Sequence, residues 1–386
     1  MTGRERILAA IAHEEPDRVP VAPRVWAWML GYYGDASLPT YLKMCEEFDC
    51  DAFWCQGTPS TTRYIYSYPD EYHLPEVKVE QHRYREGDYT VVERTFHTPA
   101  GKLSDKVKIP PPRSHYGMTP NPLLVEHLVK SKEDFERLPY LLCPVTKDMS
   151  AYHQVERMMG DRGVAEVYIL GILDQRAGDA RGMEQLMIDY YDDRGFFLEQ
   201  IDFFHHLMMD ETKAALEGGA KIIFGSWFYE SLSAGWSPKI WREVFLPRLK
   251  EQMELVHSAG ALYHFYDDGK MMGILPMLAE AGVDIVSTCT PPPVGDFDLA
   301  KAKGEFGDQL CFKGYIDLLY VVKMGTPELI ERTVKEAMEI GKPGGGFILG
   351  SSDSFREGTP IENIRAYFNA ARKYGSYRMT RNEVQR

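Results

Sequence analysis

The chain has 386 residues, of which 44% are hydrophobic and 26% are charged, and its formal net charge is −13. These values are ordinary for a globular enzyme. The acidic balance argues against a nucleic-acid-binding protein, because phosphate contacts need a basic surface. It also provides no basic stripe for an anionic membrane. No apolar run approaches the roughly 20 residues of a membrane-spanning helix, and the first residues lack the apolar core of a signal peptide.

The cysteines do not form a disulfide framework or a metal-binding CxxC motif. Six are scattered through the chain, at Cys45, Cys50, Cys55, Cys143, Cys289 and Cys311. In a chain of this length that usage is typical of a reducing compartment, so we expect a cytoplasmic protein. We expect the cysteines to be small buried hydrophobic residues.

Short runs rich in β-branched and aromatic residues recur along the chain and predict strands. There are eight of them, at 20–26, 51–57, 164–171, 221–228, 260–266, 283–289, 310–315 and 346–351. The stretches between them are mostly helical in pattern. One begins with Ser237 as N-cap and Pro238 as first residue and closes at Gly260; another covers "TPELIERTVKEAMEIG". Eight alternating strand and helix units predict an α/β fold, a single (β/α)8 TIM barrel over residues 1–386.

The surplus over the roughly 250 residues of a simple barrel falls at about 58–163. Within it, "DYTVVERTFHTPAGKLSDKVKI" has two alternating runs around the turn signal "TPAGK". This pattern predicts an antiparallel hairpin inserted near the barrel mouth, within the same domain.

In a TIM barrel the chemistry lies at the carboxyl ends of the strands. The stretch "HFYDDG" places His264, Asp267 and Asp268 at such an end. Other predicted strand ends carry the carboxylates Asp174, Glu230, Asp317 and Asp353 and the aromatic residues Trp26, Trp28, Trp54, Trp227, Tyr229, Tyr266 and Tyr315. Histidine and carboxylates are zinc ligands, yet a hydrogen-bonded core histidine and helix-capping aspartates fit the same pattern. The aromatic residues suit either a flat ligand slot or ordinary core packing.

Four stretches resemble the uroporphyrinogen decarboxylase superfamily. They are "RERILAAIAHEEPDRVPV" (4–21), "WSPKIWREVFLPRLKE" (236–251), "FKGYID" (312–317) and "GTPIENIRAYFNAARKYG" (358–375). The resemblance spans essentially the whole chain and implies the same barrel fold. The superfamily contains decarboxylases and corrinoid-dependent methyltransferases, so the resemblance implies one of two chemistries.

The decarboxylase branch binds a highly carboxylated tetrapyrrole through an arginine-rich motif after the first strand. Here the corresponding "PRVWAWMLGYYGD" keeps one arginine, Arg24, and is otherwise aromatic. An acidic chain without that basic cluster is a poor receptor for eight carboxylates. We therefore expect the methyltransferase branch.

In the methyltransferase branch, the resemblance implies a zinc ion and a corrinoid carried by a separate protein. Thiol-activating members use a His-x-Cys motif and a later cysteine, both absent here: Asp353 or Ser352 falls where that cysteine would be. Oxygen ligands favour activation of an ether oxygen, as in the aryl methyl ether demethylases. Their motif has two glutamates and a histidine; Glu243 and His264 match its second interval, while Glu230 lies closer to Glu243 than the motif requires. We expect Glu230 and His264 as zinc ligands, with Asp353, Glu243 or Cys289 completing the site.

The resulting expectation is a zinc-assisted O-demethylase that moves a methyl group from a methoxylated aromatic, or a similar O-methyl compound, to cob(I)alamin on a corrinoid protein. Asp268 and His264 are the expected catalytic residues. Substrate contacts are expected from Trp26, Trp54, Trp227, Tyr229 and Tyr315. The alternatives are a decarboxylase or lyase of a small carboxylic acid, a methylcorrinoid:thiol methyltransferase, and a non-catalytic tetrapyrrole-binding barrel. A homodimer is compatible with this fold.

Overall fold

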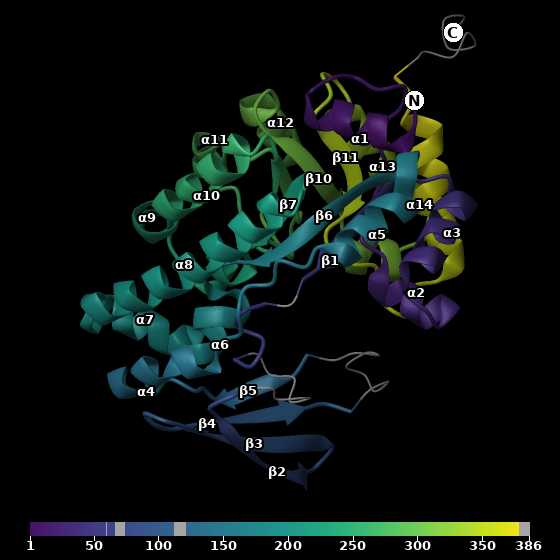
Figure 1. Cartoon of the computed structure of the whole chain (residues 1–386). Helices are drawn as coiled ribbons and strands as arrows, with labels where there is room; N and C mark the ends of the chain where they lie inside the picture. The colour runs from purple at the N-terminus through teal and green to yellow at the C-terminus, as the bar shows by residue number, and fades with distance from the viewer. Residues whose placement is uncertain (59, 66–73, 112–120, 378–386) are drawn as a thin grey trace, which may run out of the picture. The chain divides into compact units, whose positions relative to one another are not determined.

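The computed structural model describes residues 1–58, 60–65, 74–111 and 121–377 (Figure 1). The chain divides into two compact units. The first comprises Met1–Gly57, Asp148–Tyr168 and Gly219–Arg386, and the second comprises Thr58–Lys147 and Ile169–Gly218. That all of this is one domain stays a prediction.

The first unit is built on a seven-stranded parallel sheet in the order β1-β6-β7-β8-β9-β10-β11. The strands are β1 (Ala52–Gly57), β6 (Gly163–Leu170), β7 (Ile222–Ser226), β8 (Leu262–Tyr266), β9 (Ile285–Thr288), β10 (Cys311–Ile316) and β11 (Phe347–Ser351). Seven of the eight strands predicted from sequence are therefore confirmed. The runs are continuously apolar because both faces of a parallel sheet are covered, and every residue of β7, β9 and β11 is buried.

The predicted strand at 20–26 is wrong in extent. Only Val21 forms a parallel bridge, to Leu349 of β11, and helix α2 already begins at Trp26. Pro20 and Pro23 have no N–H to donate to a strand ladder. The Val21 carbonyl also accepts a hydrogen bond from the Asp51 N–H, just before β1. Residues near Val21 thus link the two edge strands, and the α/β fold resembles a TIM barrel with seven strands and one bridging segment.

Helices alternate with the strands of this sheet. They are α1 (Gly3–Ile11), α2 (Trp26–Tyr33), α3 (Leu38–Phe48), α5 (Ser150–Met159), α9 (Pro238–Ile240), α10 (Leu246–Ser258), α11 (Leu275–Ala281), α12 (Leu299–Phe306), α13 (Pro327–Gly341) and α14 (Ile361–Tyr374). A π-helical turn, Trp241–Phe245, joins α9 to α10. The Ser237 hydroxyl caps α9 as predicted, accepting from the Ile240 N–H. Within the described ranges, no helix combines the length and apolarity that crossing a membrane requires.

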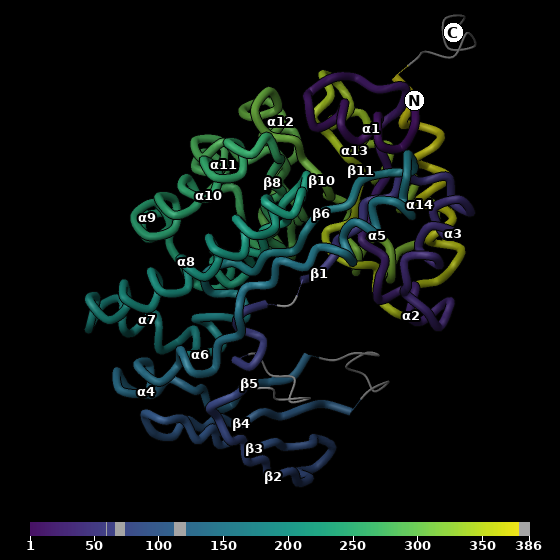
Figure 2. Tube along the Cα trace, viewed as in Figure 1, coloured from purple at the N-terminus to yellow at the C-terminus, as the bar shows by residue number. Residues whose placement is uncertain are grey.

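An apolar layer fills the amino-terminal end of the sheet. It contains the early strand residues Val164, Ile222, Ile285, Cys311 and Ile348, together with Ala22 and the α1 residues Ile7, Ala10 and Ile11. Helix α1 packs beside β11 at this end, as the tube in Figure 2 shows. Because this layer is closed by side chains, space for a ligand is left further along the strands.

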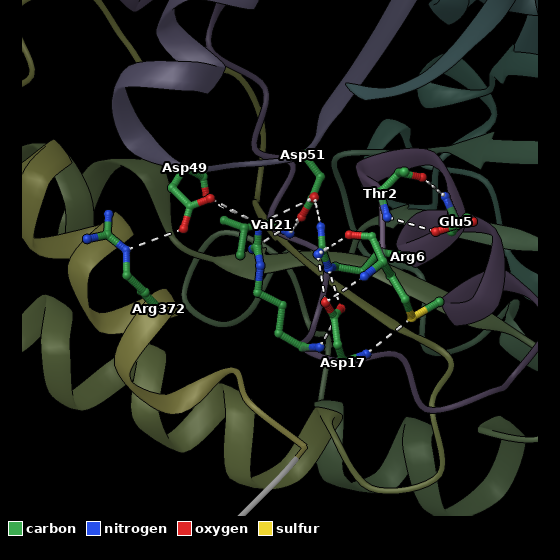
Figure 3. Close-up of polar contacts among 10 residues, drawn as sticks. Thr2, Glu5, Arg6, Asp17, Val21, Asp49, Asp51 and Arg372 are labelled. Carbon is green, nitrogen blue, oxygen red and sulfur yellow. Dashed lines mark hydrogen bonds and ion pairs between the residues drawn. The ribbon is translucent and has the colours of Figure 1, made fainter. Parts of the chain in front are cut away.

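A network of charged residues fixes the same end, and Figure 3 shows its members. Arg6 of α1 forms an ion pair with buried Asp51 and donates from Nε to Asp17 Oδ1 at 2.7 Å. Asp51 Oδ2 accepts from the Val21 N–H at 2.9 Å. The sequence stretch 4–21 therefore contributes to the fold by tying α1, the bridging segment and the start of β1 together.

The second unit contains a four-stranded antiparallel sheet in the order β2-β3-β4-β5. Its strands are β2 (Lys78–Glu86), β3 (Tyr89–Thr98), β4 (Gly101–Ile109) and β5 (Leu123–Glu126), and its helices are α4 (Lys132–Arg137), α6 (Gly178–Arg181), α7 (Met183–Asp192) and α8 (Arg194–Glu217). The predicted hairpin is β3 and β4, joined at the expected turn. The completely buried ion pair of Arg94 and Asp105 links these two strands. The sequence did not predict β2 and β5, which are largely exposed.

Candidate active site

The first unit contains a cavity of about 360 Å³. Its walls are mainly aromatic and aliphatic and carry a few charged groups. The residues that line it are Pro23, Arg24, Val25, Trp26, Met29, Ala36, Tyr41, Phe53, Trp54, Cys55, Gly57, Glu166, Tyr168, Phe224, His264 and Lys313. All of them belong to the first unit. A concave, largely apolar space with a few polar groups is the usual form of a small-molecule site.

The strand pleat explains which residues reach the cavity. Side chains two apart on a strand point to the same face. Glu166, Phe224 and Lys313 each lie two residues beyond Val164, Ile222 and Cys311 of the apolar layer. His264 follows Leu262, which packs against that layer, by the same interval. The polar groups therefore form a second layer directly above the apolar one.

His264 is held by hydrogen bonds at both ring nitrogens. Nδ1 lies 2.7 Å from Glu166 Oε2, and Nε2 lies 2.7 Å from Ser287 Oγ. All three residues are buried. Burial lowers the pKa of His264, and the charge of Glu166 opposes that shift. A neutral imidazole that donates from Nδ1 to the carboxylate and accepts the serine proton at Nε2 satisfies both contacts.

Lys313 is a buried cation in the cavity wall. Its Nζ lies 5.0 Å from the centroid of the Phe53 ring. Among the described residues we find neither a hydrogen bond nor an ion pair to this ammonium group. Burial lowers its pKa to about 8, Glu166 acts in the opposite direction, and the positive charge of Arg24 lowers it further.

Arg24 lies where the cavity meets the ends of β8 and β11. Its guanidinium is 4.5 Å from the centroid of the Tyr266 ring and 3.4 Å from Asp353 Oδ1. Asp353 also accepts from the Tyr266 hydroxyl at 3.2 Å and pairs with Arg356 at 3.0 Å. Burial opposes the charge of Arg24, but Tyr266 and Asp353 together raise its pKa, so it stays a cation.

A family model for uroporphyrinogen decarboxylase (URO-D) matches residues 176–374, more than half of the chain. The chain belongs to the uroporphyrinogen decarboxylase family. This confirms the resemblance seen in the sequence. The matched region includes β7 to β11 and so contains His264, Lys313 and Asp353.

Two relatives from Methanosarcina mazei are similar to this URO-D family chain. A methylated-thiol–coenzyme M methyltransferase is 26% identical over 137 residues, which are 36% of this chain and 34% of the relative. The match thus spans about a third of that protein's length. A solved structure described as a methyltransferase has a TM-score of 0.62 at 16% identity and covers 97% of this chain and 99% of its own. This second likeness confirms the fold.

The predicted aromatic slot is only partly assembled at the cavity. Trp26 and Trp54 line it, and Trp26 is 50% exposed. Trp227 is fully buried on the other face of the sheet, where its Nε1 donates to the Tyr263 hydroxyl at 2.7 Å and its ring stacks on Phe265.

The other two predicted aromatic residues are also outside the cavity lining. The Tyr315 ring packs near Phe297, and burial followed by the charges of Asp298 and Glu336 raises its pKa. Tyr229 packs edge-on against Phe228. Strand alternation explains the position of Trp227, whose partners Tyr263 and Phe265 alternate with the cavity-facing His264. It does not explain Tyr315, which is two residues beyond Lys313; there the positive φ of Gly314 and Tyr315 interrupts the regular strand conformation.

The predicted zinc ligands are not brought together. The backbone carbonyl of buried Glu230 accepts a hydrogen bond from Trp241 Nε1, and Glu230 is not among the residues that line the cavity, whereas His264 is. Glu243 is exposed in the π-helical turn, and Asp353 binds two arginines. Over the part of the chain that the structure describes, no group of three or more His, Cys, Asp or Glu residues is placed to hold a metal. The donors present do not fit the predicted zinc site.

Asp268 and its neighbour lie at the end of β8, close to the cavity but not in its lining. Burial and then the charge of Asp353 raise the pKa of Asp268, while Arg24 lowers it. Asp267 is fully buried, and its Oδ1 accepts from the Gly269 N–H at 2.8 Å. Of the two aspartates, Asp267 therefore shapes the turn, as one interpretation of "HFYDDG" expected.

Two polar residues of the site were not predicted from the sequence. Glu166 and Lys313 lie inside the apolar strands "VAEVYILG" and "LCFKGY". A charged residue surrounded by buried strand positions must find a partner or a ligand. The sequence contains this signal, but both residues lie inside their strands and not at the carboxyl ends, where the chemistry of a TIM barrel is expected.

Proposed function

We propose that this URO-D family protein is a methyltransferase that takes a methyl group from a methoxylated aromatic compound and transfers it to a corrinoid carried by a separate protein. The similarity to a methylated-thiol–coenzyme M methyltransferase supports methyl transfer as the reaction class. The preference for a methoxylated aromatic rests on the cavity.

The observation that carries the proposal is the size and wall chemistry of that cavity. About 360 Å³ suits a single ring with small substituents and falls at the lower end of ordinary ligand pockets. Phe53, Trp54, Tyr168 and Phe224 supply ring faces and edges for offset or edge-on contacts with an aromatic ligand. A carboxylated tetrapyrrole needs more space and more cations than this cavity offers.

In the proposed reaction the corrinoid is the methyl acceptor, and its reduced cobalt attacks the methyl carbon as the carbon–oxygen bond breaks. The protein's part is to hold the substrate in line with the acceptor and to manage the charge that develops on the departing oxygen. Buried Glu166 and His264 form a rigid floor below the ring. Asp268, whose carboxyl has a raised pKa, is the proposed source of the proton for the departing oxygen.

A methylated thiol is a second candidate donor, and the activity of the Methanosarcina relative favours it. Such a substrate needs no aromatic walls. The two donors can therefore be separated by comparing ring-bearing and ring-free methyl compounds.

The test is a methyl-transfer assay with the full chain and chemically reduced cob(I)alamin as acceptor. Methoxybenzene, 3-methoxybenzoate and dimethyl sulfide are offered separately, and formation of methylcobalamin is followed by absorbance. Demethylated product from a methoxylated ring supports the proposal. Transfer only from dimethyl sulfide would select the second candidate, and no transfer from any of the three, with a purified corrinoid protein as acceptor too, would reject both.

A further inference from the structure

The cavity carries more positive than negative charge on its walls, although the chain as a whole has a formal net charge of −13. Arg24 and Lys313 are its two cations, and Glu166 is the one carboxylate among the lining residues. Glu166 already accepts a hydrogen bond from the His264 ring. The excess charge therefore has no counterpart within the lining.

Lys313 contributes most to this imbalance. Its side chain is 5% exposed, it faces the ring of Phe53, and the described residues offer its ammonium no hydrogen-bonding or ion-pairing anion. A buried ammonium without a partner costs free energy. A fold keeps such a group at a stability cost, and a ligand that supplies the missing anion offsets that cost when it binds.

Arg24 is positioned to share the same anion. It lines the cavity, and its contact with Asp353 is a single 3.4 Å approach, since Asp353 also serves Tyr266 and Arg356. The charge of Arg24 lowers the pKa of Lys313. The charges of Lys313 and Arg24 both lower the pKa of His264. Two cations, one of them planar and forked, suit a single carboxylate or sulfonate.

We propose that Arg24 and Lys313 form a subsite for one anionic group carried by an aromatic ligand, most simply the ring carboxylate of a methoxybenzoate. This inference rests on the proposed function and deepens it by naming the substrate class. The aromatic walls hold the ring, and the two cations fix its orientation. The subsite recognises one carboxylate, in contrast to the arginine cluster expected for a polycarboxylated tetrapyrrole.

The binding test uses isothermal titration calorimetry on the full chain with 3-methoxybenzoate as the probe. Methoxybenzene controls for the ring alone, and 2-mercaptoethanesulfonate controls for an anion on an alkyl chain. Lys313→Met is expected to weaken 3-methoxybenzoate about tenfold or more, the usual contribution of a charged hydrogen bond. The same variant is expected to leave methoxybenzene within about twofold. Lys335→Met, which removes an exposed lysine of α13, is the matched control and is expected to change neither.

A second readout separates a binding role from a structural one. Because Lys313→Met removes a buried cation that lacks an ion-pair partner in the described chain, we expect its melting temperature to equal or exceed that of the wild type. A large fall in melting temperature together with loss of all ligand binding would assign Lys313 to the fold and overturn the subsite.

The pH dependence of binding gives a third readout. The groups facing Lys313 are Glu166 on β6, Cys55 on β1, Cys289 after β9, and Arg24, with His264 nearby on β8. Burial raises the pKa of the Cys55 and Cys289 thiols and lowers the pKa of His264. The pKa of Arg24 is raised by Tyr266 and Asp353. The two thiols, the imidazole and the guanidinium are therefore expected to keep the same charge between pH 7 and 9.

Lys313, with a pKa of about 8, is about nine-tenths neutral at pH 9. The affinity for 3-methoxybenzoate is therefore expected to fall about tenfold from pH 7 to pH 9 in the wild type. In Lys313→Arg, which stays charged, it is expected to stay flat.

The outcomes distinguish this subsite from the proposed function. Lys313-dependent binding of 3-methoxybenzoate without methyl transfer supports the subsite and rejects the reaction. Equal binding of 3-methoxybenzoate and methoxybenzene, or equal binding by wild type and Lys313→Met, overturns the subsite even where methyl transfer is found. Tighter, Lys313-dependent binding of 2-mercaptoethanesulfonate than of 3-methoxybenzoate overturns the aromatic class of the ligand.

Discussion

His264 Nδ1 lies 2.7 Å from Glu166 Oε2, and the pair spans from β8 to β6 beneath the cavity. The two strands are separated by β7 in the sheet, so this contact crosses the interior of the curved sheet. It fixes both the orientation of the imidazole and the depth of the cavity. The pair is therefore structural in the first place, whatever part it plays in chemistry.

This relationship predicts a loss of stability in acid. His264 has a folded-state pKa below the ordinary value of about 6.5. Below pH 6.5 the unfolded chain binds more protons than the folded one, so the free energy of unfolding falls as pH falls, by up to about 1.4 kcal/mol per pH unit from this group. Urea unfolding of wild type and His264→Gln between pH 5 and 8 measures the effect. Equal slopes for the two proteins below pH 6.5 would contradict it.

Trp26, which lines the cavity from the start of α2, and Trp227, which is buried away from it, are expected to respond differently to truncation. Trp26→Ala is expected to weaken binding of a methoxylated aromatic by about tenfold, the scale of one aromatic contact, and to leave stability nearly unchanged because Trp26 is half-exposed. Trp227→Ala is expected to cost about 3–5 kcal/mol of unfolding free energy, as for other buried tryptophans. Ligand titration and chemical denaturation of both variants decide it. Reversed effects would place the aromatic slot on the wrong face.

The separation of Glu230 from His264 predicts that the two do not share a metal. Elemental analysis of zinc per chain is expected to give the same value for the wild type, Glu230→Gln and His264→Gln. The physical reason is that both His264 nitrogens already form hydrogen bonds, and that no group of metal-binding side chains is assembled within the described residues. Equal loss of zinc in both variants would restore the site predicted from sequence.

The Arg6 network is expected to be strongly stabilising. Removing the guanidinium in Arg6→Met leaves buried Asp51 with Arg18, at 3.3 Å, as its cationic partner, and the loss is expected to cost up to about 3–5 kcal/mol. Burial raises the pKa of Asp51, and the charges of Arg18 and Arg6 oppose that shift, so the variant should also raise it further.

The matched control for this variant is Lys373→Met. Its ion pair with Glu331 is exposed and is expected to contribute at most about 1 kcal/mol. Urea denaturation of both variants measures the difference. Similar midpoints for Arg6→Met and Lys373→Met would show that the network contributes little.

Much of the fold was readable from the sequence, because strand and helix patterns are local. The seven apolar runs were found since a covered parallel sheet buries both faces of each strand. The run at 20–26 failed because its prolines remove ladder donors. The sequence did not predict β2 because its side chains are mostly exposed and polar. Its strand conformation depends on antiparallel pairing with β3.

The candidate site was harder to predict, since it depends on which face of a strand each residue occupies. His264 was identified from its position at a strand end. Its neighbour Tyr263 faces the opposite side of the sheet, where its hydroxyl accepts a hydrogen bond from Trp227. Glu166 and Lys313 lie mid-strand, and only the register of distant strands brings them to the cavity that His264 lines. Spacing along a strand indicates the face on which each residue lies, but not which distant strands meet at the cavity.

The bridge between Val21 and Leu349 has a consequence for biosynthesis. The segment around Val21 is hydrogen-bonded to β11, a strand that the ribosome makes much later. During translation the backbone groups around Val21 cannot form these hydrogen bonds until β11 has been made. Contacts so distant in sequence also form slowly. We therefore expect a ribosome-bound chain that ends before residue 347 to be protease-sensitive around Val21, and a released chain that includes β11 to be protected there.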